Sequence, residues 1–450
     1  MMTTICICFI VLLFAGVPIA VIIGVTTAVS LAFYTNTPLH IITQQLFNAL
    51  DKFVLLAIPF FILAGSIMTR GGIARRLINF VNALVGWFPG GLAMAGILAC
   101  IFFAAISGSS PATVVAIGSI MIPALIKAGY GERFSLGLIT VSGSLGIVIP
   151  PSIPMILYCL VMNVSVAEMF MAGVLPGLMI GAALMIYTWI IARRNNWRVE
   201  QKASIKELIT ATKRGFWALM LPLVVLGGIY SGIFTPTEAA AVSVIYALVV
   251  EMFIYKEFGF GDITSICKDA AVLSASLLFI LSCAMTFIWL LTAEQIPQHL
   301  AEIVISHFDS PWMFLLTVNI LFLILGCFVD DVSAMLILAP LFLETLNQYG
   351  IDLVHFGIVM VLNIQIGMLT PPFWPQSLCR RRNYQEAADS GLPGSRAFSW
   401  YHADLSAFGH LYTVDFPGSA KTAYQLKVVN YVVFCYQNRT DRYCHKRPVS

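Results

Sequence analysis

The sequence predicts an all-α polytopic membrane protein built from two inverted repeats, with broken helices and re-entrant hairpins. Three observations predict this fold class. Of the 450 residues, 59% are hydrophobic and only 10% are charged, whereas a soluble globular domain carries about 25% charged residues. Long apolar stretches recur through the first 373 residues, with room for roughly ten to twelve spanning or re-entrant segments. A short motif that breaks a helix occurs once in each half.

The repeated motif ends in two prolines. Gly146–Pro151 reads GIVIPP, and Gly367–Pro372 reads GMLTPP 221 positions later. A pair of prolines interrupts a helix, because each lacks a backbone N–H and clashes with the preceding turn. In a bilayer, broken backbone is tolerated only where protein buries it or where it lines a polar cavity. Two breaks at corresponding positions therefore indicate a binding site near the middle of the membrane.

Ten long apolar stretches follow one another along the chain. They run over Ile5–Phe33, Phe53–Met68, Leu92–Ile106, Phe134–Ile149, Met169–Ala192, Phe216–Tyr230, Ala239–Phe253, Ala270–Leu291, Met313–Val329 and Phe356–Leu369. The first is too long for the core of a signal peptide and has no basic flank, so we expect a retained first helix. Two shorter runs, Val114–Ile126 and Ala334–Leu343, suit the second arms of re-entrant hairpins.

Basic residues divide the chain. A cluster of arginines at 70, 75 and 76 follows the second stretch, and seven basic residues crowd positions 193–214 against two glutamates. Because basic loops stay in the cytoplasm, we place both segments there. The long one separates a first membrane half, residues 1–192, from a second half, residues 215–373. In each half a helix precedes a small or polar motif, an apolar run with a proline, and a helix that ends in two prolines.

Two polar motifs occupy equivalent places in the halves. The motif SGSSPAT interrupts an apolar run. It can offer hydroxyl and freed carbonyl oxygens to a cation such as Na⁺, and the candidate residues are Ser107, Gly108, Ser109, Ser110 and Thr113. Tight helix packing through small residues is the alternative. In GCFVDDVS, Asp330 and Ser333 are the corresponding candidates, because a carboxylate within the membrane is expensive. For Asp330 the alternative is a helix N-cap.

Further polar residues precede the two breaks. Hydroxyls and amides there can line a shared cavity for Na⁺ or for the oxygens of an organic acid, or they can join helices by hydrogen bonds. The candidates are Ser142, Ser144, Pro150, Pro151, Asn363, Gln365, Thr370 and Pro371. We expect no other metal.

Other classes of function find little support in the sequence. Thr235–Glu238 reads TPTE and predicts a helix start with a capping box, so Glu238 is interpreted as structural. An intramembrane protease needs carboxylates from two helices, but Asp330 and Asp331 are neighbours. A phosphate loop of the GxxxxGK type does not occur, and nothing points to an enzyme, an organic cofactor or nucleic acid.

Six motifs in order make the chain similar to the large membrane subunit of TRAP transporters, the DctM-like permeases. The matching segments are Ile58–Gly65, Ser107–Tyr130, Ile149–Tyr158, Gly232–Ala241, Gly326–Leu341 and Gly367–Pro372. The resemblance implies an elevator-type Na⁺ symporter of an organic acid, such as a C4-dicarboxylate or sialic acid, in the bacterial inner membrane. It also implies two partners, a small four-helix membrane subunit and a periplasmic substrate-binding protein. By the resemblance, the two polar motifs are hairpin tips that face the two breaks.

The chain departs from the family pattern after Phe373. Residues 374–450 carry ten Lys and Arg against five Asp and Glu, and no stretch among them is long enough to span a membrane. We interpret this atypical polar tail as the product of a frameshift near codon 373, with an authentic soluble tail as the alternative. A real frameshift would remove the last helices of the second half and would leave a non-transporting permease remnant.

Overall fold

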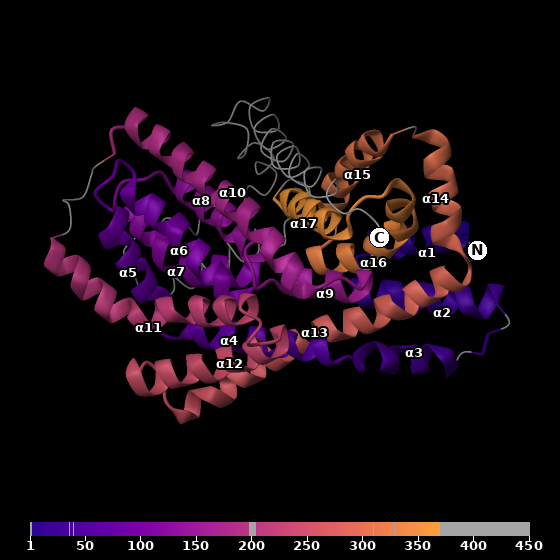
Figure 1. Ribbon diagram of the computed structural model, residues 1–450, viewed down its shortest axis with the longest axis horizontal. Coiled ribbons are helices and arrows are strands. Elements are labelled where there is room, and N and C mark those ends of the chain that lie inside the picture. The colour runs from indigo at the N-terminus through magenta and orange to yellow at the C-terminus, as the bar shows by residue number, and fades with distance from the viewer. Residues whose placement is uncertain are drawn as a thin grey trace, which may run out of the picture. The chain divides into compact units, whose positions relative to one another are not determined.

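A computed structural model describes residues 2–369 apart from 36, 39, 198–203, 309 and 328, and every element within those residues is a helix (Figure 1). The first part of the chain forms α1 (Met2–Phe14), α2 (Ile19–Tyr34), α3 (His40–Leu50), η1 (Phe53–Leu56), α4 (Ala57–Arg70), α5 (Ile73–Val85), α6 (Gly91–Ser107), α7 (Ser110–Lys127), α8 (Glu132–Gly143), η2 (Ser144–Ile147), α9 (Ile153–Met162) and α10 (Val166–Arg194). The second part forms α11 (Ile205–Tyr230), α12 (Pro236–Val249), η3 (Val250–Ile254), α13 (Phe260–Ala293), α14 (Ile296–His307), α15 (Pro311–Gly326), α16 (Asp331–Tyr349) and α17 (Leu353–Met368).

Among the described helices, six are long and apolar enough to cross a membrane, and five shorter ones are also apolar. Leu223 of α11 exposes 62% of its surface, and Ile186 of α10 exposes 58%. Large apolar side chains face outward along many of these helices, as they do in a protein surrounded by lipid. The predicted class, an all-helical polytopic membrane protein, is confirmed.

The N-terminal stretch differs from the prediction. We expected one helix over Ile5–Phe33, but the structure has α1 and α2 with a break between them. Gly16 adopts a left-handed backbone with φ of 71°, and Pro18 is the N-cap of α2. Glycine tolerates this conformation, and a proline cannot donate the backbone hydrogen bond that would continue the helix. Local backbone chemistry therefore ends α1 although the apolar composition continues.

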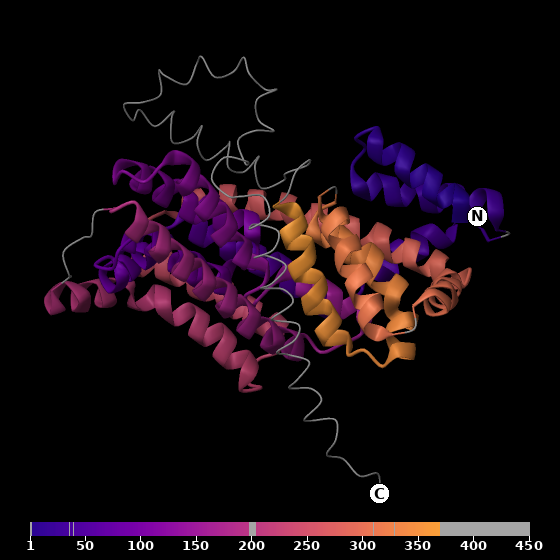
Figure 2. The same ribbon diagram turned by 90° about the horizontal axis from the view of Figure 1, so that it is seen from above.

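The two halves repeat the same order of elements. In the first half α4 and α5 precede the helix pair α6–α7, which is followed by α8; in the second half α13 and α14 precede the pair α15–α16, followed by α17. Both arms of each pair pack against the helix that follows it. Figure 2 shows α15, α16 and α17 as neighbouring orange helices.

Long helices from both halves pack together around α4. Helix α12 packs against α4, and α13 contacts α2, α3 and α4 over its 34 residues. Helix α11 packs against α5. The segment at 193–214, expected as a loop, is helical from Ile205 onward because Ser204 and Glu207 form a capping box. The packing of α5 on α11 brings Arg76 of the first basic cluster into one groove with Lys206 and Arg214 of the second.

The predicted capping box at Thr235 is confirmed. The Thr235 hydroxyl accepts a hydrogen bond from the Glu238 backbone N–H at 3.3 Å, and the Glu238 carboxylate accepts one from the Thr235 N–H at 2.8 Å. Glu238 therefore has the structural position that the sequence indicates, at the start of α12.

Candidate functional site

The first polar motif forms the tip of a helix hairpin. Helix α6 ends at Ser107, Gly108 has a left-handed backbone with φ of 61°, and the extended Ser109 is the N-cap of α7. The glycine is required by space as well as by conformation, since a Cβ atom at Gly108 would lie 2.7 Å from the carbonyl oxygen of Pro151. The chain thus reverses direction within two residues, directly against the first proline pair.

Hydroxyl groups gather at this tip. The side-chain oxygens of Ser107 and Thr113 lie 2.9 Å apart, and the Thr113 hydroxyl donates to the carbonyl of Ser109 at 2.9 Å. Ser107, Ser110 and Thr113 are buried. The tip therefore presents several oxygen atoms within the protein, two of them hydroxyls and at least one a main-chain carbonyl.

The first Pro-Pro break packs onto the same tip. Helix α8 ends at Gly143 and passes through η2 to a cis peptide bond between Pro150 and Pro151, before α9 begins. The Ile153 N–H donates to the carbonyl of Gly108 at 3.2 Å. A Cβ atom at Gly146 would lie 2.6 Å from the Ser109 carbonyl oxygen. The structure thus brings together the motif and the break that the sequence assigned to one site.

The second polar motif begins α16. The Asp330 carboxylate accepts a hydrogen bond from the Ser333 backbone N–H at 3.1 Å, which makes Asp330 the N-cap of α16. This is the alternative that the sequence left open for Asp330. Ser333 itself is buried, and its hydroxyl has no hydrogen-bond partner among the described residues.

The glycine of the second Pro-Pro motif packs against its own hairpin. A Cβ atom at Gly367 would lie 2.7 Å from the Cα of Gly326, so the two backbones touch where α15 and α17 cross. Thr370, Pro371 and the tail from residue 374 lie outside the described residues. Within the described part, the second half repeats the contact between a hairpin and the glycine of the motif.

Polar side chains precede both breaks at matching positions. The offset of 221 relates Ser142 to Asn363 and Ser144 to Gln365. The Ser144 hydroxyl donates to the Val141 carbonyl at 2.6 Å, whereas the Ser142 hydroxyl is buried without a partner among the described residues.

Of the two amides in α17, the first is paired and the second is not, the reverse of the two serines. The Asn363 amide donates to the Val359 carbonyl at 2.8 Å and to the side chain of Asn319 in α15. The buried Gln365 has neither amide atom paired within the described part of the chain. Asn319 is a residue that the sequence analysis missed, and its only signal was a lone amide in an apolar stretch.

The structure assembles two clusters rather than one. The first joins Ser107, Gly108, Ser109, Ser110 and Thr113 to Gly146–Pro151. The second joins α15, the start of α16 and α17. Helix α9, which follows the first break, packs against α16 and α17 and thereby connects the two clusters. The Tyr158 hydroxyl donates to the Leu353 carbonyl at 2.6 Å across this contact.

The chemistry offered is that of hard oxygen donors. Hydroxyls, amides and main-chain carbonyls suit a cation such as Na⁺ or the hydrogen-bonding groups of a small polar solute. The described residues hold no group of three or more His, Cys, Asp or Glu placed to share a metal ion.

Comparisons with known proteins all find transporters. The family model of the DctM component of tripartite ATP-independent periplasmic transporters matches residues 6–374. A C4-dicarboxylate TRAP transporter large permease protein of Rhodobacter capsulatus is 46% identical over 375 residues, which are 80% of this chain and 85% of the relative. The sialic acid TRAP transporter large permease protein of Vibrio cholerae is 36% identical, over 80% of this chain and 84% of its own length. The YdaH transporter of Alcanivorax borkumensis has a similar fold, with a TM-score of 0.56 at 13% identity, over 88% of this chain and 86% of that one.

Proposed function

The chain belongs to the family of DctM components of tripartite ATP-independent periplasmic (TRAP) transporters, and we propose on this premise that it carries an organic acid across the bacterial inner membrane in symport with Na⁺. The observation that carries the proposal is the contact between each helix hairpin and the glycine of a Pro-Pro motif. Such paired breaks supply unpaired backbone oxygens inside a membrane protein, where water cannot satisfy them.

The substrate is proposed to be a small carboxylate. The similar permeases named above are a C4-dicarboxylate permease and a sialic acid permease. Both substrates are organic acids that carry negative charge at neutral pH. The described clusters contain hydroxyl and amide donors that can bind a carboxylate, and a bound cation would offset its charge.

Sodium ions are proposed to bind at the two hairpin tips. In the first half the ligands are the oxygens of Ser107, Ser109 and Thr113, and in the second half they come from Ser333 and the Asn363–Gln365 segment. Gln365 and Ser333 support the second site, because both are buried and their side chains have no hydrogen-bond partner among the described residues. Such groups cost free energy unless a ligand pairs them.

Two partners complete the proposed transporter. The family name describes a tripartite, periplasmic system, which supports a soluble periplasmic substrate-binding protein and a small four-helix membrane subunit beside this chain. In this arrangement the chain forms the translocation pathway, and we propose that neither ATP hydrolysis nor enzymatic turnover takes part.

The test is uptake into liposomes that contain the permease with its small subunit, supplied with the binding protein and a labelled C4-dicarboxylate. We expect uptake with an inward Na⁺ gradient and none when K⁺ replaces Na⁺. Thr113→Val removes the shared hydroxyl at nearly constant volume and should raise the Na⁺ concentration for half-maximal uptake at least fivefold. Thr212→Val in α11 is the matched control, because its hydroxyl also donates to a carbonyl one turn earlier and lies outside the proposed site. Uptake that is equal in K⁺ and Na⁺ would refute the coupling.

One observation favours a second candidate, a permease remnant without transport activity. The family match ends at residue 374, whereas the chain continues to residue 450. This supports the proposed frameshift near codon 373. Sequencing the DNA across that codon distinguishes a frameshift from an authentic tail. A shifted frame that encodes further apolar helices would support the frameshift, and one continuous frame through Ser450 would refute it.

A further inference from the structure

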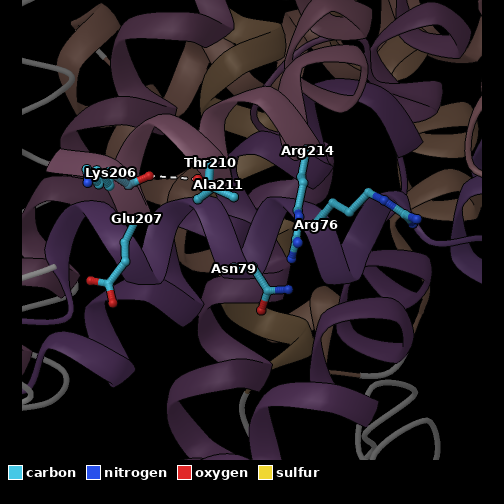
Figure 3. Close-up of a pocket in the computed structure, with 7 residues that line it drawn as sticks. All are labelled: Arg76, Asn79, Lys206, Glu207, Thr210, Ala211 and Arg214. Atoms are coloured by element: carbon cyan, nitrogen blue, oxygen red, sulfur yellow. Dashed lines mark hydrogen bonds between the residues drawn. The ribbon is translucent and has the colours of Figure 1, made fainter. Parts of the chain in front are cut away.

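We propose that the groove between α5 and α11 binds the phosphate headgroup of an anionic phospholipid. The groove has a volume of about 400 Å³ and is lined by Arg76, Asn79, Lys206, Glu207, Thr210, Ala211 and Arg214 (Figure 3). Arg76 and Asn79 come from α5, and the other residues come from the first three turns of α11. The inference requires only that the chain lies in a membrane, so it does not depend on the proposed transport.

The groove carries an excess of positive charge. Its lining includes Arg76, Lys206 and Arg214 against one carboxylate, Glu207. The Glu207 carboxylate accepts a hydrogen bond from the Ser204 backbone N–H at 2.8 Å as part of the capping box of α11. Within the described residues, neither Lys206 nor Arg214 forms an ion pair. These two side chains therefore supply positive charge that the described carboxylates do not neutralise.

The α5 wall of the groove is held in place by other contacts. Arg76 forms an ion pair with Glu257 at 2.7 Å, and its guanidinium lies 3.8 Å from the centre of the Tyr255 ring. The Tyr255 hydroxyl in turn donates to the carbonyl of Arg214 at 3.1 Å. Figure 3 shows the Arg214 side chain extending from α11 toward Asn79 of α5. An anion in the groove would thus meet the Arg214 guanidinium and the Asn79 amide, one from each helix.

The position of the groove along α11 favours a lipid phosphate as the bound anion. Helix α11 changes from a polar to an apolar sequence at Gly215, one residue after Arg214. Trp217 follows within one turn, is 40% exposed, and lies with its ring centre 6.5 Å from that of Tyr246 in α12. Tryptophan and tyrosine mark the level of the lipid headgroups. Phosphate groups of lipids are concentrated at this level, and basic pockets between membrane helices bind them.

The experiment measures lipid binding to the purified full-length permease in a neutral detergent by native mass spectrometry. The probes are phosphatidylglycerol, phosphatidylcholine and inorganic phosphate, and the test variant is Lys206→Gln with Arg214→Gln. The control variant, Lys127→Gln with Arg133→Gln, removes the same charges from exposed positions outside the groove. Both test positions are exposed, so the variant should fold; its unfolding midpoint without lipid checks this.

We expect tighter binding of phosphatidylglycerol than of phosphatidylcholine to the wild-type chain. Each removed cation should weaken phosphatidylglycerol binding about fivefold, the factor that corresponds to about 1 kcal/mol for a basic residue near a membrane surface. The control variant should bind like the wild type. Equal binding of the two lipids, or unchanged binding by the test variant, would overturn the proposal. Binding of inorganic phosphate as tight as that of phosphatidylglycerol, and lost in the same variant, would assign the groove to a free anion instead.

Discussion

Gln365 buries an amide in α17 with neither of its polar atoms paired among the described residues. A buried polar group of this kind costs roughly 1–3 kcal/mol of folding free energy when it is left unsatisfied. The position is related by the offset of 221 to Ser144, next to the first break. This cost is consistent with the proposal that Gln365 binds an ion or substrate.

Gln365→Met should separate stability from function. Methionine has nearly the same volume and no hydrogen-bonding groups, so the unfolding midpoint of the detergent-solubilised permease should rise, by the equivalent of roughly 1 kcal/mol. Na⁺-driven uptake should fall at least tenfold. The control is Leu362→Met on the same helix, a conservative change at a buried apolar position. A variant with wild-type uptake would show that Gln365 binds neither ion nor substrate.

At the scale of the elements, the close crossing of α15 and α17 depends on two glycines, which have no side chains to separate the helices. Gly326 and Gly367 bring the two backbones so close that a Cβ at Gly367 would lie 2.7 Å from a Cα atom and 2.8 Å from the Leu323 carbonyl oxygen. These atoms belong to the main chain and cannot rotate away. The glycine of the Pro-Pro motif therefore has a packing role besides any role in the break.

Gly367→Ala should force α17 away from α15. We expect a loss of roughly 1–3 kcal/mol, the usual cost of overpacking a tight contact, measured as a lower unfolding midpoint. Gly137→Ala in α8 is the matched control, because no atom lies within 4 Å of its added Cβ. That variant should be as stable as the wild type or more stable by about 0.5–1 kcal/mol, since alanine favours the helix.

A second contact between elements joins α5 to the π-helical turn after α12. The Glu251 carboxylate is buried and accepts hydrogen bonds from the backbone N–H groups of Gly72 and Ile73 at 2.9 and 2.8 Å. These donors lie at the start of α5, where a helix leaves its first N–H groups unpaired and favours negative charge. The π-helical turn at η3 places the carboxylate there.

Glu251→Gln should weaken this junction at constant size. One amide oxygen can replace only one of the two carboxylate oxygens, so we expect a loss of roughly 1–3 kcal/mol, again read from the unfolding midpoint. Glu257→Gln, which breaks only the partly exposed pair with Arg76, should cost less than about 1 kcal/mol. Equal effects of the two substitutions would contradict the assigned role of Glu251.

On the scale of the whole described molecule, α9 ties the first half to the second. The hydroxyl of the buried Tyr158 donates a hydrogen bond to the Leu353 carbonyl in the second half. Gly357 leaves room for the Tyr158 ring, since a Cβ atom at Gly357 would lie 2.5 Å from a ring carbon. Helix α9, which follows the first break, therefore packs on α17, the helix that contains Asn363 and Gln365. A movement of one cluster must be accommodated by the other through this contact.

Tyr158→Phe tests this connection between the halves. Loss of the hydroxyl leaves the Leu353 carbonyl without this donor, at a cost of about 1 kcal/mol, and the unfolding midpoint should fall accordingly. Tyr230→Phe serves as control, because its hydroxyl makes no hydrogen bond among the described residues. If both variants melt at the same temperature as the wild type, the hydrogen bond between the halves contributes nothing to stability.

The sequence predicted the local features well. The interruption of the helix at Pro150–Pro151, the turn at Ser107–Ser110 and the capping box at Thr235 follow from residues that are adjacent in the chain. Several local features were missed, including the helices α3 and α14. The break at Gly16 lay inside an apolar stretch, and the amphipathic helix α5 was hidden by its polar residues, although its buried positions Ile73, Leu77 and Val81 recur at helical spacing.

The sequence by itself determined the class of protein, the break in the first half and several residues that end or begin helices, because composition and backbone chemistry act over a few residues. Only the tertiary structure decided the partners: Asn319 for Asn363, Gly326 for Gly367, and Glu251 for the start of α5. Each of these pairs joins separate helices. Their contact depends on how all the intervening helices pack, and that packing is a sum over many side chains that no single motif records.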